Sequence, residues 1–273
     1  MGYPILNILL CVPILMYTLM VLIFWFQWRR QENKKQYPET MPVTFLSVVI
    51  AARNEENTIP FLLQKLSEQH YPPHLYEILV IDDHSEDHTA LVTEQYIHTS
   101  STGFRLLRAE GTGKKSALRQ GIREAKGKLI VTTDADCIPG PFWLQRIEQF
   151  YRKNKLRMVL GPVAIEPGHR LFGQMQSIEF ASLVGSGAAS LQLGIPSMCN
   201  GANLAIDKET FLAVGGYSGT DHLASGDDEF LMHKIAHQYP EDVRFLFDRE
   251  AVVSTKAQRD WTGFFQQRLR WAS

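Results

Sequence analysis

The sequence predicts an α/β fold in which helices cover both faces of a mainly parallel sheet, preceded by one apolar helix. Three observations support this fold class. Short runs rich in valine, isoleucine and leucine alternate with segments whose apolar residues recur at helical spacing. Several of these runs end abruptly in aspartates, and ligands of open α/β sheets collect at the carboxyl ends of strands. Residues 1–28 contain no Asp, Glu, Lys or Arg.

Residues 4–28 are expected to form a transmembrane helix. They would span about 37 Å at roughly 1.5 Å per residue, which is enough to cross a bilayer with some tilt. Aromatic residues end this segment and basic residues follow it, whereas no Lys or Arg precedes it (Trp25, Phe26, Trp28, Arg29, Arg30, Lys34 and Lys35). The positive-inside rule therefore predicts a cytoplasmic location for the rest of the chain. The alternative is a cleaved signal peptide, but the apolar run is too long and no small-residue cleavage site follows it.

The composition limits the remaining possibilities. A chain of 273 residues with 45% hydrophobic content can form one large α/β domain, which we expect over residues 44–273 after a linker at 29–43. The net charge is −1, and the basic residues form no stripe, so no nucleic-acid partner is expected. Three widely spaced cysteines are expected to be free thiols rather than disulfides or zinc ligands: Cys11, Cys137 and Cys199.

Two strand-turn-helix units are expected first in the domain. A strand at 45–52 leads through a polar turn to a helix at 58–69, and a strand at 76–81 leads to a helix that begins near Thr89. The second strand ends in Asp82 and Asp83, whose carboxylates suit a base NH or ribose hydroxyls. Alternatively, the acids and serine of this turn only cap the next helix.

A glycine turn is the next candidate site. Gly111, Gly113 and Lys114 follow a short strand at 105–107 and precede a helix at 116–126. The spacing is not that of a P-loop, so no ATPase is predicted. Backbone NH groups and Lys114 could still bind a phosphate.

Asp134 and Asp136 follow the next apolar run, which begins at Leu129. Two aspartates one residue apart would repel each other in a dry site, so a cation between them is the simplest explanation, namely Mg²⁺ or Mn²⁺ that also carries phosphate oxygens. A solvated loop after a core strand is the competing interpretation.

The second half contains less regular signals. We expect a helix at 142–153 and strands at 158–164, 199–206, 244–247 and 251–254. The segment 174–193 has almost no charge and could lie on a membrane surface or pack as a core helix.

Two candidate sites fall in this half. Asp227 and Asp228 open a helix, where acids also occur for purely electrostatic reasons. The helix at 261–271 ends with Arg270 and Trp271, which could neutralise and stack on a ligand.

The ordered set of these motifs resembles the inverting family 2 glycosyltransferases with a GT-A fold, specifically the membrane branch of cellulose, chitin, hyaluronan and poly-N-acetylglucosamine synthases. The motifs are Asp82-Asp83, Asp134-x-Asp136, Gly226-Asp227-Asp228 and Gln267-x-x-Arg270-Trp271. The resemblance covers about residues 45–271. It implies a GT-A, Rossmann-like sheet with a nucleotide-binding half at 44–140 and an acceptor-binding half at 141–273.

The resemblance also implies a role for each matching residue. The donor-binding residues would be Ala52, Arg53, Glu55, Asp82, Asp83, Lys114, Asp134 and Asp136. Asp134 and Asp136 would hold the metal, with Asp136 the more direct ligand, and Asp228 would be the catalytic base. Asp227, Gln267, Arg270 and Trp271 would form the acceptor and pyrophosphate side. The printed sequence ends at Ser273, directly after the last motif, so we expect no translocation channel within it.

The predicted function is therefore metal-dependent, inverting transfer of a sugar from a nucleotide donor, which the resemblance suggests is UDP-linked, to a glycan or lipid acceptor at the cytoplasmic membrane face. Other synthase subunits are possible partners. Two alternative functions fit the sequence less well. A phosphatase using Asp-x-Asp is disfavoured because that motif normally ends the first strand. A catalytically silent nucleotide-sugar-binding subunit would lack Asp136 or Asp228, and both are present.

Overall fold

The computed structural model describes residues 3–32, 41–99, 103–219 and 226–272. The first half contains helix α1 (Tyr3–Glu32), strand β1 (Leu46–Ala52), helix α2 (Ile59–Ser67), strand β2 (Tyr76–Asp82), helix α3 (Thr89–Thr99), strand β3 (Gly103–Arg108), helix α4 (Lys114–Glu124), strand β4 (Leu129–Thr132) and strand β5 (Ile138–Pro139). The second half contains α5 (Trp143–Asn154), β6 (Met158–Leu160), β7 (Val163–Glu166), α6 (Leu171–Gln192), β8 (Leu204–Asp207), α7 (Lys208–Ala213), α8 (Asp227–Gln238), β9 (Val243–Phe245), β10 (Val253–Lys256) and α9 (Trp261–Ala272).

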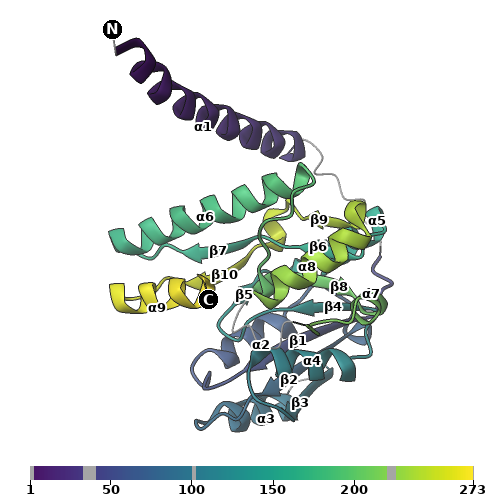
Figure 1. The fold of residues 1–273 in the computed structure, drawn as a ribbon. Coiled ribbons are helices and arrows are strands. Elements are labelled where there is room, and N and C mark those ends of the chain that lie inside the picture. The colour runs from purple at the N-terminus through teal and green to yellow at the C-terminus, as the bar shows by residue number, and fades with distance from the viewer. Residues whose placement is uncertain (1–2, 33–40, 100–102, 220–225, 273) are drawn as a thin grey trace.

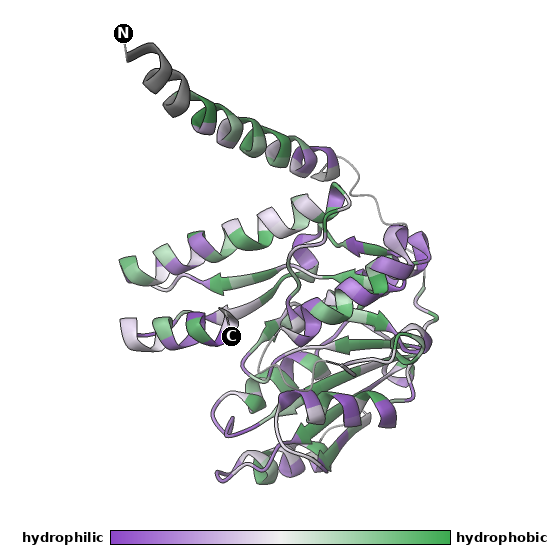
Figure 2. Cartoon of the chain, viewed as in Figure 1, coloured by the Kyte–Doolittle hydropathy of each residue, from purple (hydrophilic) through white to green (hydrophobic). Residues whose placement is uncertain are grey.

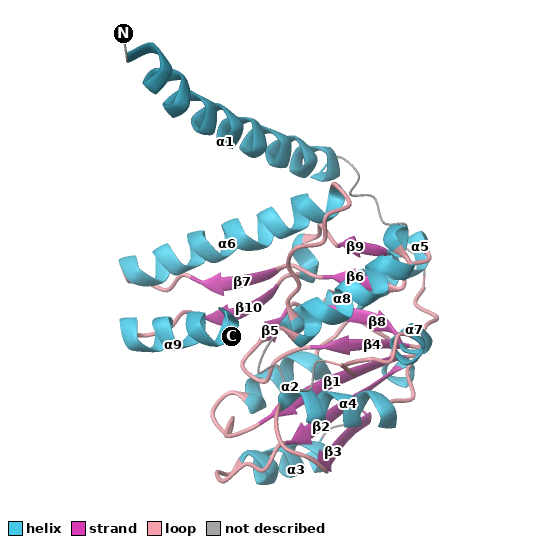
Figure 3. Cartoon of the chain, in the orientation of Figure 1, coloured by secondary structure: helices cyan, strands magenta, loops and turns pink. Residues whose placement is uncertain are grey.

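A seven-stranded sheet forms the centre of the domain, in the order β3-β2-β1-β4-β8-β6-β9 (Figures 1 and 3). Strands β1 to β4 are parallel, and β8 runs antiparallel to both of its neighbours. The chain moves outward from β1 to β2 and β3, and then returns to the other side of β1 as β4. This reversal places a topological switch point between β1 and β4, where ligands of such sheets bind.

Alternation along each strand explains how helices cover both faces of the sheet. Val48 and Ile50 of β1 pack in one cluster with α2 and α5, whereas Val49 packs in the other with α4 and α8. All three side chains are fully buried. Figure 2 shows the apolar colouring concentrated in the central strands. Each such side chain stabilises the fold by about 1.5–3 kcal/mol, so the pattern of β1 fixes its place at the centre.

The predicted strand at 158–164 is wrong as a single element. It divides into β6, which belongs to the large sheet, and β7, which joins β10 and β5 in a separate three-stranded sheet. The break falls at Gly161 and Pro162. The buried Asn203 causes this break. Its backbone carbonyl accepts a hydrogen bond from Gly161 N at 2.8 Å, and its side-chain amide donates to Pro162 O at 2.8 Å. A Cβ at Gly161 would lie 2.2 Å from this amide, so only glycine allows the contact.

Three smaller differences concern element bounds. The N-terminal helix continues to Glu32, four residues beyond its predicted end, and most of the predicted linker lies outside the described residues. The strand expected at 199–206 is limited to β8, because a short 3-10 turn occupies Gly201–Asn203. The six-residue helix α7 and the two-residue strand β5 were not predicted.

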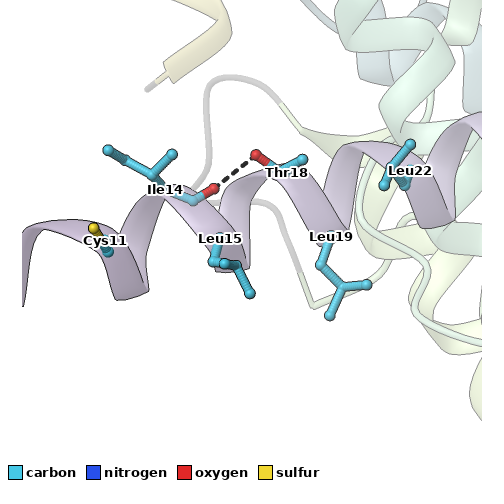
Figure 4. A pocket seen from close by; sticks show the side chains of 6 residues that line it. All are labelled: Cys11, Ile14, Leu15, Thr18, Leu19 and Leu22. Atoms are coloured by element: carbon cyan, nitrogen blue, oxygen red, sulfur yellow. Dashed lines mark hydrogen bonds between the residues drawn. The ribbon is translucent and has the colours of Figure 1, made fainter. Parts of the chain in front are cut away.

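Helix α1 projects away from the domain, and only its C-terminal end approaches α6 (Figure 1). There Trp28 packs edge-on against Phe247 with ring centroids 5.0 Å apart. In the described part of the chain, one helix is long and apolar enough to cross a membrane, over Cys11–Arg30 of α1. Six of its side chains line a pocket on its own surface (Figure 4): Cys11, Ile14, Leu15, Thr18, Leu19 and Leu22. Thr18 donates its hydroxyl to Ile14 O at 2.8 Å, so this polar group is satisfied within the helix, as a bilayer would require.

Helix α6 combines features of both expected alternatives. Phe180, Ala188 and Ala189 are buried against the domain. Leu171, Met175 and Ile178 remain exposed at its N-terminal end. The helix is therefore a core element on one side and an uncovered apolar surface on the other.

Candidate active site

The predicted acids lie on elements that meet at one edge of the large sheet. Asp82 ends β2, Asp134 and Asp136 follow β4, and Asp227 and Asp228 open α8. Since β2, β1 and β4 are parallel neighbours, their carboxyl ends face the same edge. The acidic motifs thus converge at the switch point of the fold.

Asp82 and Asp83 are both buried and have different partners. Both carboxylate oxygens of Asp83 accept from the backbone N–H of Gly113 at 3.0 Å. Asp82 accepts from Ser85 N at 3.4 Å, and its backbone carbonyl accepts from Ala109 N. Asp83 therefore holds the glycine turn in place, which leaves Asp82 as the better candidate for direct contact with a nucleoside.

Lys114 connects the glycine turn to the aspartate pair. Its Nζ lies 2.6 Å from Asp134 Oδ1, with half of the side chain exposed. Desolvation opposes the charge of Lys114, but the carboxylates of Asp134 and Asp228 outweigh it and raise its pKa above the ordinary value. The ammonium is therefore present at any physiological pH, and it faces acids from β4 and α8 at once.

The loop after β1 lies beside the same acids. Ala52 is buried, and Arg53 is exposed. Glu55 donates its backbone N–H to Thr89 Oγ1 at 2.7 Å, which ties this loop to the start of α3. Burial raises the pKa of Glu55, and the negative charges of Asp136 and Asp134 raise it further. The negative charges of Asp134 and Asp136 therefore make ionisation of Glu55 less favourable.

The aspartate pair fits a divalent metal ion. Within the described residues, one group of side chains could hold a metal: Asp134, Asp136 and Cys137, whose ligand atoms all lie within 4.8 Å of one another. Carboxylate oxygens are the ligands that Mg²⁺ and Mn²⁺ prefer. Burial raises the pKa of the Cys137 thiol, so this sulfur stays protonated and is a poor ligand for either ion. Asp136 also accepts from Thr255 Oγ1 of β10 at 3.1 Å.

Asp228 lies between Gly201 and Tyr217, which belong to two different segments. Its carboxylate packs against the backbone of Gly201, and Tyr217 Oη donates to its Oδ1 at 3.5 Å. Burial raises the pKa of Asp228, Lys114 opposes that rise, and the charges of Asp134 and Asp227 add to it. A carboxylate with a raised pKa suits a general base.

Asp227 has a separate structural partner. Its Oδ1 lies 2.7 Å from Lys115 Nζ, and both side chains are less than one-fifth exposed. This ion pair joins the start of α8 to the start of α4. The two adjacent aspartates therefore differ: Asp227 binds a neighbouring helix, and Asp228 faces the acid cluster.

The predicted acceptor-side residues lie on α9, which packs against α6. The ring centroids of Trp271 and Phe180 are 5.5 Å apart. The guanidinium of Arg268 lies over the Trp271 ring and forms an ion pair with Glu179. Gln267 accepts from the Arg268 guanidinium at 3.1 Å, and Arg270 is exposed. These contacts do not bring Gln267 or Trp271 to the acids, so their role stays a prediction.

Sequence reasoning missed four residues that shape the site: Thr132, Lys115, Gly201 and Tyr217. Each acts through a contact far away along the chain, so no local spacing marks it. The closest local signal is the Asn200-Gly201 pair, whose residue types are typical of any tight polar turn.

Comparison with known proteins places this geometry in a class. A family model described as glycosyl transferase family 2 matches residues 47–211. This span includes both strand-end acid pairs and Lys114. The chain therefore belongs to glycosyl transferase family 2, as the sequence motifs indicated.

Individual relatives refine the comparison. A poly-β-1,6-N-acetyl-D-glucosamine synthase of Staphylococcus epidermidis is 28% identical over 276 residues, which cover 97% of this chain and 64% of the relative. A synthase of the same name from Staphylococcus aureus is 28% identical over 275 residues, with the same coverage. The chain thus spans slightly less than two thirds of the length of these curated relatives.

Solved structures show the same fold. A mannosyltransferase of Pyrobaculum calidifontis in complex with GDP-Man and Mn²⁺ has a TM-score of 0.70 at 21% identity, covering 96% of this chain and 70% of that chain. Residues 1–349 of S. aureus TarS with UDP-GlcNAc have a TM-score of 0.60 at 17% identity, covering 79% of this chain and 59% of that chain. The predicted GT-A fold is confirmed.

Proposed function

We propose that this chain transfers a sugar from a nucleotide-sugar donor to a glycan or lipid acceptor, with inversion at the anomeric carbon. The observation that carries the proposal is the position of Lys114, 2.6 Å from Asp134 and electrostatically coupled to Asp228. The Lys114 ammonium therefore interacts both with Asp134, a candidate ligand of the diphosphate-bound metal, and with Asp228, the candidate base. This is the charge distribution that displacement of a nucleoside diphosphate needs.

Each group of site residues is assigned one role in this reaction. Departure of the diphosphate leaves negative charge on its β-phosphate, which Lys114 stabilises from the glycine turn. The acceptor hydroxyl loses a proton as it attacks, and Asp228 takes that proton. Arg270, Gln267 and Trp271 are assigned to the acceptor and pyrophosphate side. Asp82, with Ala52 and Arg53, is assigned to the nucleoside.

Asp134 and Asp136 would hold Mg²⁺ or Mn²⁺. A bound divalent ion supplies Lewis-acid stabilisation of the diphosphate leaving group. The two carboxylates offer the oxygen donors that such an ion needs, and the Thr255 contact orients Asp136.

UDP-N-acetylglucosamine is our first choice of donor. The curated relatives are named as poly-β-1,6-N-acetyl-D-glucosamine synthases, and one structural neighbour was solved with UDP-GlcNAc. GDP-mannose is the comparison donor, since another neighbour was solved with GDP-Man.

We further propose that α1 anchors the protein in the membrane with the catalytic domain on the cytoplasmic side. Its exposed apolar surface over Cys11–Arg30 and the arginines at its end support this orientation. The exposed residues Trp261, Phe265 and Leu269 of α9 add an apolar surface suited to the same membrane face.

A donor screen tests the proposal. Membranes containing the chain are incubated with each nucleotide sugar, and the released nucleoside diphosphate is measured with and without chelator. We expect release from UDP-N-acetylglucosamine above that from GDP-mannose, with loss of release in chelator. Donor binding without release would instead support the silent-subunit alternative.

A further inference from the structure

The carboxylate of Asp228 lies against a glycine that belongs to a different element. Gly201 begins the 3-10 turn directly before β8, and a Cβ built on it would lie 2.1 Å from Asp228 Oδ2 and 2.7 Å from its Cγ. Real Cβ atoms do not approach other atoms so closely. Any side chain at position 201 would therefore force the Asp228 carboxylate to move.

Gly201 is itself fixed to the end of β4. Thr132, which is 1% exposed, donates its hydroxyl to Gly201 O at 2.7 Å. Asn200 closes the turn from the other side, because its Oδ1 accepts from Ala202 N at 3.0 Å. The turn is thus tied to the strand that carries the aspartate pair two residues further on.

Tyr217 restrains the other carboxylate oxygen. It is 2% exposed, packs edge-on against Phe211 at 5.2 Å, and donates its hydroxyl to Asp228 Oδ1 at 3.5 Å. The two oxygens of Asp228 are therefore contacted from two directions, Oδ2 by a backbone surface and Oδ1 by a phenol at the long end of hydrogen-bond distance.

We propose that Gly201, Thr132 and Tyr217 are positioning residues that hold the Asp228 carboxylate at a fixed place relative to the Lys114–Asp134 pair. The inference rests on the proposed function, in which Asp228 is the base. A base acts only when it lies within hydrogen-bond reach of the attacking hydroxyl, and a displacement of about 1 Å can cost about 100-fold in rate. The three residues need not touch either substrate to control turnover.

The main test is Gly201→Ala in the full chain, in membranes, with UDP-N-acetylglucosamine as donor. We expect kcat to fall about 10- to 100-fold, with the KM for the donor and the affinity for UDP changed less than about threefold. Gly185→Ala is the matched control, because the nearest atom to its Cβ is on Trp28 at 3.9 Å and normal turnover is expected.

A double substitution separates positioning from a general structural effect. If Gly201 acts through Asp228, then Gly201→Ala should cost nothing further once Asp228→Asn is present. Equal losses in the two backgrounds would overturn the inference. Full turnover of Gly201→Ala beside a strong Asp228→Asn defect would also overturn it and leave the proposed function intact. Normal turnover of Asp228→Asn would overturn the proposed function itself.

Tyr217→Phe provides an independent readout that does not add volume. The groups that face Asp228 are Lys114, Asp134, Asp227, Tyr217 and Cys199. Of these, Tyr217 lowers the pKa of Asp228 by its hydrogen bond, so its removal should raise that pKa. Since the base must be deprotonated, the acidic limb of the kcat–pH profile should move to higher pH. An unmoved limb would contradict the positioning role, and this variant decides the question if Gly201→Ala fails to fold.

Discussion

Asp227 and Asp228 are neighbours in sequence, yet the structure predicts opposite consequences for removing each charge. Asp228→Asn removes the proposed base, and we expect turnover to fall by roughly 10²–10⁴-fold while UDP affinity is retained. Asp227→Asn leaves Asp228 in place, and we expect turnover to fall less than about tenfold. The two variants should also differ in stability: Asp227→Asn, which has the smaller effect on turnover, should lower the melting temperature, whereas Asp228→Asn should not.

The stability difference follows from the partners. Burial raises the pKa of Asp228, so the folded protein binds this proton more tightly than the unfolded chain does. The charged Asp228 carboxylate therefore opposes folding at pH values above its folded-state pKa. This destabilisation decreases as the pH falls through that pKa. Asp228→Asn removes an unfavourable charge, so the melting temperature at neutral pH should stay the same or rise.

Asp227 behaves in the opposite way. Its pair with Lys115 at 2.7 Å is mostly buried. Exposed pairs contribute about 0–1 kcal/mol, and breaking a fully buried pair costs about 3–5 kcal/mol, so we expect a loss of about 1–3 kcal/mol. For a domain of this size that corresponds to a decrease of about 2–12 °C in melting temperature.

Thermal unfolding and UDP release, measured on both variants at pH 7, test this crossed pattern. Lys115→Met is the matched control, since it should reproduce the stability loss of Asp227→Asn. Similar, mild effects of the two aspartate substitutions on both stability and turnover would refute the reasoning. Both acids would then act only as favourable charges at a helix N-terminus, worth about 0.3–1 kcal/mol each.

Two further predictions concern the metal and the membrane. Asp136→Ala should abolish metal-dependent binding of UDP-N-acetylglucosamine with little change in melting temperature, because an exposed strand-end carboxylate contributes little to the core; calorimetry with and without Mn²⁺ measures this, and unchanged affinity would exclude the metal site. Protease added to right-side-out vesicles should spare the chain beyond α1 if the domain is cytoplasmic; digestion from outside would reverse the proposed orientation.

The first half of the fold could be predicted from sequence because its information is local. In β1 and β4, continuous runs of buried apolar residues indicate strands with both faces covered, and each run ends at a polar turn. The helix after each turn carries its own apolar periodicity. The parallel order of β2, β1 and β4 then brings the aspartates at the ends of β2 and β4 to one edge of the sheet.

The second half could not be predicted equally well because its bounds depend on distant contacts. The Val163 segment continues the apolar run of β6, and only the buried amide of Asn203 shows that the chain changes sheets at Gly161. Helix α7 has six residues, too few for a periodic pattern. The same reason explains why Gly201 and Tyr217 were not recognised: they contact Asp228 across 27 and 11 residues respectively.

The contact between Thr255 and Asp136 has a mechanical consequence for α9. The six residue steps from Thr255 to Trp261 span at most about 22 Å, so the start of α9 is tethered within that distance of Thr255, which contacts Asp136. Midway along this tether, the buried side chain of Gln176 in α6 makes two hydrogen bonds of 3.0 Å to the backbone of Gln258. A sliding motion of α6 would strain these two bonds, and the backbone between Gln258 and Thr255 would transmit the displacement to Asp136, the candidate metal ligand.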